Sequence, residues 1–331
     1  MKKINVRESE GYELFHDITQ ILPGKFKGVK FLRGHKIRKE DIDILISLGK
    51  ENIYVFEEKD KEKNLIHENE AAYFIIEKLN LNKNLFDISD IKEGKINIIA
   101  KEDSVLKIDI ETLNKINSIG DIILVTKYNS TFISKGEILA ATRIITFMIE
   151  KKQLYKLEKI TKNKKVLNLK KIYKNIEIGL ITTGNEIYNG IIKDKSKEAL
   201  LVKFKKYGIS NMEQIFSKDD KNMIKKYISN FENTKDIIIC TGGMSVDPDD
   251  VTPKAIRESG WNVITYGTPI LPGAMFMLAY KGKKVLLGLP GGVVFSKKTV
   301  FDILLPIILS KGKISKKELI KMGHGGLLEQ I

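Results

Sequence analysis

A short apolar segment that ends abruptly in two glycines constrains the fold of this chain more than any other feature. Residues 236–240, Asp-Ile-Ile-Ile-Cys, are rich in β-branched side chains and predict a strand that is buried on both faces. Thr-Gly-Gly follows at 241–243, and a helix is expected from Thr252 and Pro253, with Thr252 as its N-cap. A buried strand, a glycine turn and a helix in this order indicate an anion site at the carboxyl edge of an α/β sheet.

The second half of the chain alternates predicted strands with predicted helices. Strands are expected at 176–182, 209–216, 236–240, 261–266, 275–280 and 285–288. Helices are expected at 195–206, from an N-cap among residues 217–220 to about 231, at 253–259, and from about 295 to 309. This alternation predicts an α/β fold with a three-layer, mostly parallel sheet and right-handed crossovers.

Three of the predicted strands end in turns that carry glycines. These turns are Thr-Thr-Gly-Asn-Glu at 182–186, Thr-Gly-Gly-Met-Ser-Val-Asp at 241–247, and Leu-Pro-Gly-Gly at 289–292. Because the carboxyl ends of parallel strands share one edge of a sheet, we expect the turns to converge on one crevice. Their backbone N–H groups would hold phosphate, and the oxygens of Glu186, Asp247 and Asp250 are candidate ligands for Mg²⁺.

The first half of the chain has a mixed pattern. Helices are expected at 39–48, 68–79 and 110–119, and strands at 52–57, 96–100, 105–108, 122–126 and 138–149. We therefore expect four parts: a mixed α+β region at 1–150, a lysine-dense linker or edge hairpin at 151–175, an α/β binding domain at 176–312, and a C-terminal tail at 313–331.

Composition argues against several classes of protein. The net charge of +15 comes almost wholly from scattered lysines, so we expect an anionic small ligand and no nucleic-acid partner. No apolar run has the length of a membrane span, and the first residues lack an apolar signal core. A single cysteine rules out a disulfide within the chain, which fits a cytoplasmic location.

Several of these residues also have a purely structural interpretation. Thr252 is expected to be only a helix cap, and Cys240 only a small buried hydrophobe. Gly242 and Gly243 could serve the backbone geometry alone. No histidine stands near Ser245 in a pattern typical of a hydrolytic triad, and no Walker or G-x-G-x-x-G motif is present.

The glycine turns also carry a family resemblance. The segment 181–186, the run Thr-Gly-Gly-Met-Ser followed by Asp250, the Pro-Gly at 272–273 and the Leu-Pro-Gly at 289–291 resemble the molybdopterin-binding domain of molybdenum-cofactor biosynthesis proteins. That domain occurs in molybdopterin adenylyltransferases, in molybdenumtransferases and in CinA-like proteins. The pattern Gly-Tyr-x-Leu-x-His-Asp-Ile-Thr at 11–19 is similar to molybdopterin-binding proteins as well, so the whole chain resembles the molybdenumtransferase-like branch most.

The resemblance implies a ligand, a metal ion and a reaction. The ligand would be molybdopterin, a phosphorylated pterin, or its adenylylated form, and a Mg²⁺-dependent insertion of molybdate would release AMP. Glu186 and Asp250 would be catalytic, and they would bind the metal together with Asp247. The ligand would contact Thr183, Gly184, Asn185, Thr241, Gly242, Gly243, Ser245, Pro272, Gly273, Pro290 and Gly291.

Departures from the family pattern keep two alternatives open. Leu271 replaces a lysine of the family, and Gly292 replaces an asparagine, which removes polar groups expected for transferase chemistry. One alternative is therefore a non-catalytic carrier or regulator that presents the pterin to an apo-molybdoenzyme. The other is a CinA-like nucleotide pyrophosphatase. Because relatives commonly form dimers or trimers, a homo-oligomer is also expected.

Overall fold

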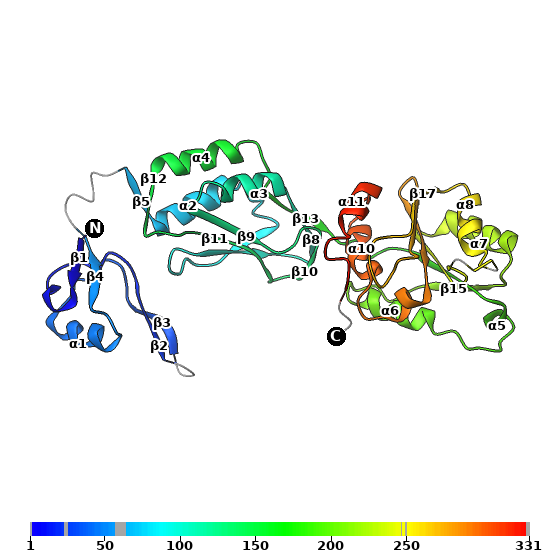
Figure 1. Cartoon of the computed structure of the whole chain (residues 1–331), viewed down its shortest axis with the longest axis horizontal. Coiled ribbons are helices and arrows are strands. Elements are labelled where there is room, and N and C mark those ends of the chain that lie inside the picture. The colour runs from blue at the N-terminus through cyan, green and yellow to red at the C-terminus, as the bar shows by residue number, and fades with distance from the viewer. Residues whose placement is uncertain (1, 23–25, 57–63, 246, 249, 329–331) are drawn as a thin grey trace. The chain divides into compact units, whose positions relative to one another are not determined.

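The computed structural model describes residues 2–22, 26–56, 64–245, 247–248 and 250–328 (Figure 1). It divides into two compact units. Unit 1 comprises Met1–Lys101, Ile108–Lys127 and Gly136–Asn168, and unit 2 comprises Glu102–Lys107, Tyr128–Lys135 and Leu169–Ile331. Unit 2 thus takes in two short segments from the first half of the chain. Within the described residues, no helix combines the length and the apolar character needed to cross a membrane.

Unit 1 is a mixed α+β structure. Its elements are β1 (Lys2–Asn5), the 3-10 helix η1 (Val6–Glu8), β2 (Ile18–Leu22), β3 (Phe26–Phe31), α1 (Lys39–Ser47), β4 (Asn52–Val55), β5 (Leu65–His67), α2 (Glu68–Lys78), β6 (Phe86–Ile88), β7 (Ile96–Ala100), α3 (Ile110–Asn117), β9 (Ile122–Thr126), β11 (Ile138–Ile144), β12 (Met148–Glu150) and α4 (Lys151–Thr161). The largest sheet is antiparallel, in the order β6-β7-β11-β9, and α2 packs against β11. A small separate core near the N-terminus gathers Ile4, Leu14, Leu45 and Val55.

The lysine-dense stretch that we expected to be a linker or hairpin begins with a helix, α4. Leu154, Leu157 and Thr161 are buried at spacings of three and four residues, which places them on one face of the helix. Lys78 of α2 forms an ion pair with Glu158 of α4, with 2.9 Å between Nζ and Oε1. The lysine count had obscured this apolar face, so the expectation of a linker was wrong for residues 151–161.

Unit 2 contains the alternating strands and helices. A small sheet in the order β10-β8-β13, from β8 (Ser104–Ile108), β10 (Phe132–Ile133) and β13 (Leu167–Lys171), falls largely in this unit. The other elements are β14 (Ile178–Thr183), α5 (Asn185–Tyr188), α6 (Ser196–Lys205), β15 (Glu213–Ser217), α7 (Lys221–Thr234), β16 (Ile237–Thr241), α8 (Thr252–Glu258), β17 (Asn262–Tyr266), β18 (Met277–Lys281), β19 (Lys284–Leu289), α9 (Gly291–Phe295), α10 (Val300–Leu309) and α11 (Lys316–Lys321).

A six-stranded sheet in the order β15-β14-β16-β19-β18-β17 forms the centre of unit 2. Strands β15, β14, β16 and β19 are parallel, and the hairpin β17–β18 is antiparallel at one edge. The predicted α/β fold with a mostly parallel sheet is therefore confirmed.

Helices cover both faces of this sheet. Since successive residues of each strand point to opposite sides, each strand contributes to a core on either face. On β16, Ile237 and Ile239 join a core with Phe204 of α6 and Phe301 of α10. Ile238 and Cys240 point the other way, into a core with α7 and α8. The strands are buried on both faces, as the continuous apolar runs predicted.

The long helix expected from about residue 295 to 309 is two helices, α9 and α10. Thr299 and Asp302 form a capping box, which starts α10 independently of α9. The intervening residues 296–299 link the two helices. The expectation of one helix was wrong because a single apolar stretch concealed this second start.

Candidate functional site

Three parallel strands of unit 2 end side by side. Thr182 of β14 is paired with Thr241 of β16, and Thr241 is paired with Leu289 of β19. The turn that follows each strand therefore lies at the same edge of the sheet, next to its neighbour. The structure thus brings the three glycine turns of the sequence together.

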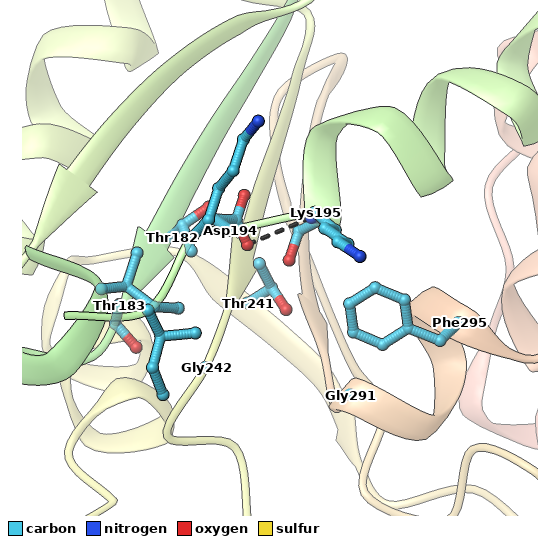
Figure 2. A pocket seen from close by; sticks show the side chains of 12 residues that line it. Thr182, Thr183, Asp194, Lys195, Thr241, Gly242, Gly291 and Phe295 are labelled. Carbon is cyan, nitrogen blue, oxygen red and sulfur yellow. Dashed lines mark hydrogen bonds between the residues drawn. The ribbon is translucent and has the colours of Figure 1, made fainter. Parts of the chain in front are cut away.

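A pocket of about 330 Å³ opens between these strand ends (Figure 2). Its walls are formed by Thr182, Thr183, Ile187, Ile192, Lys193, Asp194, Lys195, Ser196, Thr241, Gly242, Gly291 and Phe295. One residue or more from each of the three turns is present in this set. Two lysines, two apolar residues and an exposed phenylalanine add positive charge and apolar surface to the hydroxyls of the strand ends.

Asp194 is an acid inside this pocket that sequence reasoning had missed. Its carboxylate accepts from the backbone N–H of Ser196 at 3.1 Å and from Nε2 of Gln214 at 2.7 Å. Gln214 also donates to Oγ1 of Thr182, at 2.9 Å. Since Thr182 accepts this bond, its own hydroxyl proton remains available to an acceptor in the pocket.

Gly242 is a glycine for steric reasons. Its φ angle is +93°, and a Cβ atom at this position would lie 2.2 Å from the backbone oxygen of Thr183. No other residue can therefore occupy this position without moving the end of β14. The turn after β16 is built to approach the end of β14 closely.

Thr252 has a different role from the helix cap that we expected. It is the first residue of α8, Val251 is the N-cap, and no side chain caps the helix. Thr252 is completely buried, and its Oγ1 lies 3.2 Å from Oγ1 of Thr183. The expectation of a sole capping role was wrong, because this threonine joins α8 to the end of β14.

Asp250 holds the loop that follows Gly243. Its Oδ2 accepts from the backbone N–H of Ser245 at 2.6 Å. Tyr266 supports the same loop by donating its hydroxyl to the carbonyl oxygens of Ser245, at 3.0 Å, and Met244, at 3.3 Å. Burial raises the pKa of Tyr266, so it remains a hydroxyl donor at neutral pH. Val246 and Asp249, in the same loop, lie outside the described residues.

The turn after β14 lines a second, larger hollow of about 580 Å³. Gly184, Asn185 and Glu186 line it, together with Ile187, Ile192, Asp219, Pro248 and Val251. Asn185 and Asp219 are joined by two bonds, each from the backbone N–H of one to the side chain of the other, at 3.0 and 3.3 Å. Glu186 is exposed on α5. The residues of this turn therefore divide between two adjoining hollows.

Other predicted ligand residues do not line either hollow. Gly273 is buried, and a Cβ there would lie 2.3 Å from Cγ1 of Val300, so this glycine allows α10 to pack closely. Pro272 accepts from the backbone N–H of Val300 at 3.2 Å. Pro290 is the N-cap of α9 and accepts from the N–H of Val293 at 2.8 Å. Pro290 thus holds α9, which contributes to the pocket, whereas Pro272 and Gly273 contact α10.

Glu186, Asp247 and Asp250 are not gathered into a metal site that is formed in advance. Among the residues that the structure describes, no three His, Cys, Asp or Glu side chains are grouped so that they could hold a metal ion. A Mg²⁺ ion that accompanies a phosphorylated ligand needs only one or two carboxylates, because phosphate and water oxygens complete its shell. Glu186 lines the second hollow, and Asp250 is among the lining residues of neither hollow.

Comparison with known proteins gives this pocket a context. Residues 179–310 match the family model described as "Probable molybdopterin binding domain". This part of the chain is therefore similar to the molybdopterin-binding domain family. Residues 3–57 match a model described only as a domain of unknown function. The matched range of the first model contains β16, β19, all of β14 after its first residue, and every residue that lines the pocket.

Individual proteins resemble parts of the chain. A CinA-like protein of Petrotoga mobilis is 39% identical over 80 residues, which cover 24% of this chain and 20% of the relative. A "putative molybdopterin biosynthesis protein" of Methanocaldococcus jannaschii is 30% identical over 141 residues, 38% of this chain and 35% of the relative. The chain thus spans about a fifth to a third of these relatives. A solved molybdopterin biosynthesis MoeA protein from Pyrococcus horikosii is 18% identical, with a TM-score of 0.35, and the match covers 74% of this chain and 79% of that one.

Proposed function

We propose that the molybdopterin-binding domain holds a phosphorylated pterin, molybdopterin or its adenylylated form, in the pocket between the three strand ends. The observation that carries this proposal is the convergence of Thr183, Gly242 and Gly291, from three different turns, on one pocket of about 330 Å³. That volume is near the lower end of the range typical of small-molecule sites, roughly 300 to 1,000 Å³.

The lining of the pocket suits the two chemical parts of such a ligand. Hydroxyls of Thr182 and Thr241 and the ammonium groups of Lys193 and Lys195 suit a phosphate. The ring of Phe295 is 60% exposed and offers a flat apolar surface to a heterocycle. The pocket therefore offers anion-binding groups beside an aromatic surface.

The reaction that we propose is the insertion of molybdate into adenylylated molybdopterin, with release of AMP. Mg²⁺ would neutralise phosphate charge, and Glu186 and Asp250 are the carboxylates that would help to hold it. Asp194, which also lines the pocket, would orient the ligand or accept a proton from it. The chain would thus act late in the biosynthesis of the molybdenum cofactor.

A carrier role is the second candidate, and a specific observation favours it. Leu271, which replaces a lysine of the family, is 54% exposed and lies outside the set of residues that line the pocket. Its backbone instead pairs with the segment near the C-terminus, donating to Gly326 and accepting from Leu328, each at 2.8 Å. A carrier would keep the pterin and present it to an apo-molybdoenzyme without releasing AMP.

One purification distinguishes these functions. The protein is isolated from a host that makes molybdopterin, and bound pterin is released, oxidised and measured by fluorescence. We expect pterin on the protein, and AMP on addition of Mg²⁺ and molybdate. Pterin without AMP would select the carrier. The absence of pterin, with hydrolysis of a nucleotide pyrophosphate, would replace both with the CinA-like activity.

Two lysine-to-methionine variants, which change the net charge equally, are compared, and the second is the control. Lys195→Met removes an ammonium group from the pocket and should lower the retained pterin by roughly tenfold, the loss expected for a charged hydrogen bond. Lys283→Met removes an exposed ammonium group from the turn before β19, at the opposite edge of the sheet. It should retain as much pterin as the unmodified protein.

A further inference from the structure

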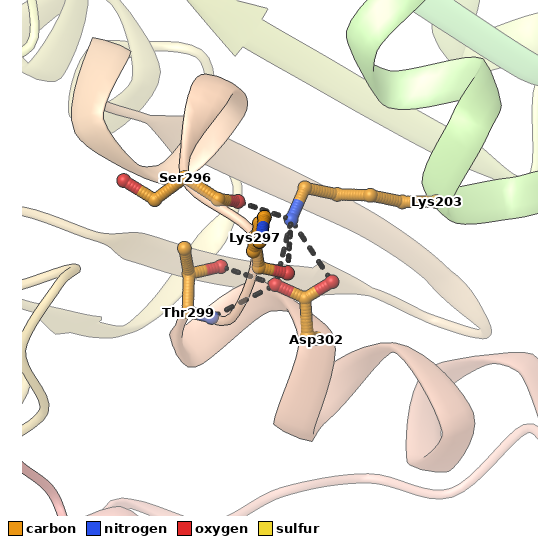
Figure 3. A network of polar contacts seen from close by, with 5 residues as sticks. All are labelled: Lys203, Ser296, Lys297, Thr299 and Asp302. Atoms are coloured by element: carbon orange, nitrogen blue, oxygen red, sulfur yellow. Dashed lines mark hydrogen bonds and ion pairs between the residues drawn. The ribbon is translucent and has the colours of Figure 1, made fainter. Parts of the chain in front are cut away.

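Lys203 is a buried lysine outside the pocket, and the role inferred for it below rests on the proposed function of that pocket. Its side chain is only 9% exposed, although it belongs to α6 on the surface of the sheet. Its Nζ donates to the carbonyl oxygen of Ser296 at 2.8 Å and to that of Lys297 at 3.4 Å (Figure 3). It also contacts both carboxylate oxygens of Asp302, at 2.7 and 3.0 Å.

These contacts fix the link between α9 and α10. Residues 296–299 form that link, and Asp302 holds its far end by accepting from the N–H and the hydroxyl of Thr299, both at 2.8 Å. Lys203 binds the near end, at Ser296, directly after the last residue of α9. One ammonium group and one carboxylate thus hold both ends of the link, and we name this pair the Lys203–Asp302 clasp.

Two walls of the pocket depend on the elements that the clasp joins. Helix α6 begins at Ser196, next to Asp194 and Lys195, which form one wall. Gly291 and Phe295 of α9 form another wall (Figure 2). Lys203 lies about two turns along α6 from Ser196, so one rigid helix carries the first wall and the group that holds the second.

The second wall has limited packing of its own. Val293 and Val294 anchor α9 in the core, but Phe295 is 60% exposed. A Cβ atom at Gly291 or at Gly292 would meet no atom within 4 Å. The polar contacts at Ser296 are therefore well placed to fix the end of α9 that carries Phe295.

We propose that Lys203 is a positioning residue: through the Lys203–Asp302 clasp it sets the separation between the Asp194–Ser196 wall and the Phe295 wall, and thereby the fit of the ligand. A small displacement of a group that orients a ligand can cost up to roughly 100-fold in activity. The ion pair is a means of holding geometry, since a buried pair contributes little net stability compared with apolar residues.

The test combines amide hydrogen exchange with pterin retention. Lys203→Met should raise the exchange of residues 291–299 about tenfold or more, while residues 237–241 in β16 exchange as before. The pterin retained per folded protein should fall by roughly tenfold or more. Lys205→Met, which alters an exposed lysine on the same helix, is the matched control and should change neither quantity.

A double variant separates positioning from stability. Lys203→Met alone leaves the carboxylate of Asp302 without its cation, which destabilises the fold. Combining it with Asp302→Asn removes that charge and keeps an oxygen that can accept from Thr299. We expect the double variant to regain thermal stability. The amide hydrogens of residues 291–299 should still exchange fast, and the variant should still retain little pterin.

Two outcomes would overturn the proposal. In the first, Lys203→Met shows the same hydrogen exchange at residues 291–299 and the same pterin retention as Lys205→Met. In the second, the double variant regains both the slow exchange and the pterin retention of the unmodified protein. If the unmodified protein retains no pterin, the proposed function fails, and the exchange of residues 291–299 still decides whether Lys203 holds the wall.

Discussion

The Oγ1 atoms of Thr183 and Thr252 lie 3.2 Å apart in the interior of the binding domain, although 69 positions separate the two residues in the sequence. Thr183 ends β14, and Thr252 begins α8. A Cβ atom added to Gly243 would lie 3.2 Å from Oγ1 of Thr252 and 3.6 Å from Oγ1 of Thr183. The glycine turn therefore packs directly against this pair of hydroxyls.

Replacing either threonine of this pair by valine keeps the shape and removes one hydroxyl. We expect Thr183→Val and Thr252→Val each to lower the free energy of unfolding by about 1 kcal/mol, because a buried hydroxyl loses its partner. The double variant should cost less than the sum of the two, since neither hydroxyl is then left alone. Urea unfolding of the four proteins measures this coupling, and strictly additive effects would contradict it.

Gly242→Ala should disrupt the turn. The added Cβ would lie 2.2 Å from the backbone oxygen of Thr183, at a φ of +93°. We expect a loss of about 2 kcal/mol or more in the free energy of unfolding, together with the loss of bound pterin. Gly292→Ala is the control, because its Cβ enters open space. Equal pterin retention by both alanine variants would show that the close approach at Gly242 is unimportant.

Two substitutions of Asp250 distinguish a role in holding the loop by a hydrogen bond from a role of its negative charge in binding Mg²⁺. Asp250→Asn keeps an oxygen for the N–H of Ser245 and removes the negative charge, whereas Asp250→Ala removes both. If the charge serves Mg²⁺, Asp250→Asn should abolish the Mg²⁺ dependence of AMP release while the loop keeps its protection in hydrogen exchange. Asp250→Ala should lose about 1 to 2 kcal/mol of stability as well. An asparagine variant with unchanged Mg²⁺ dependence would assign Asp250 to the loop alone.

The stability of unit 1 should fall in mild acid. Burial lowers the pKa of His67 to about 4, and burial also lowers the pKa of His16. A histidine whose folded-state pKa lies below its unfolded value costs stability as the pH falls from about 6.5 toward 4, because only the unfolded chain takes up the proton there. Burial raises the pKa of Glu68, which opposes part of this loss at the acid end.

His67→Asn is the matched variant for this prediction. Nδ1 of His67 accepts from the backbone N–H of Asn69 at 3.2 Å as the cap of α2, and asparagine is a favourable cap without a titrating ring. Between pH 6.5 and 4, the variant should lose about 2 kcal/mol less stability than the unmodified protein. The measurement is unfolding of unit 1 by denaturant across that pH range. Parallel pH profiles would show that His67 does not contribute.

Local signals in the sequence were sufficient to predict the central strands and turns of the sheet in the binding domain. The β-branched run at 237–239 and the glycines that follow it act over a few residues, and the structure has a buried strand and a turn there. Asp220, expected near a helix start, caps α7 by accepting from the N–H of Met223 at 2.7 Å. Burial raises the pKa of Cys240 to about 12, in keeping with its predicted role as a small hydrophobe.

Contacts between distant residues could not be predicted in this way. Asp194 lies in a loop with no periodicity, and it is joined to Gln214, 20 positions away, only by the folded sheet. Phe295 was placed within a long apolar stretch, and its exposure follows from the new helix that Thr299 starts. The turns could be found from their glycines, but the opposite walls of the pocket carry no comparable local signal.

The burial of Cys240 has a practical consequence for spectroscopy. It is the single cysteine of the chain, it is completely buried, and its raised pKa leaves almost no thiolate at neutral pH. A thiol-reactive dye or spin label will therefore react only with a cysteine introduced elsewhere, and no native residue needs to be removed first. Gly292→Cys, beside the pocket wall in open space, would report on ligand occupancy in an otherwise unmodified protein.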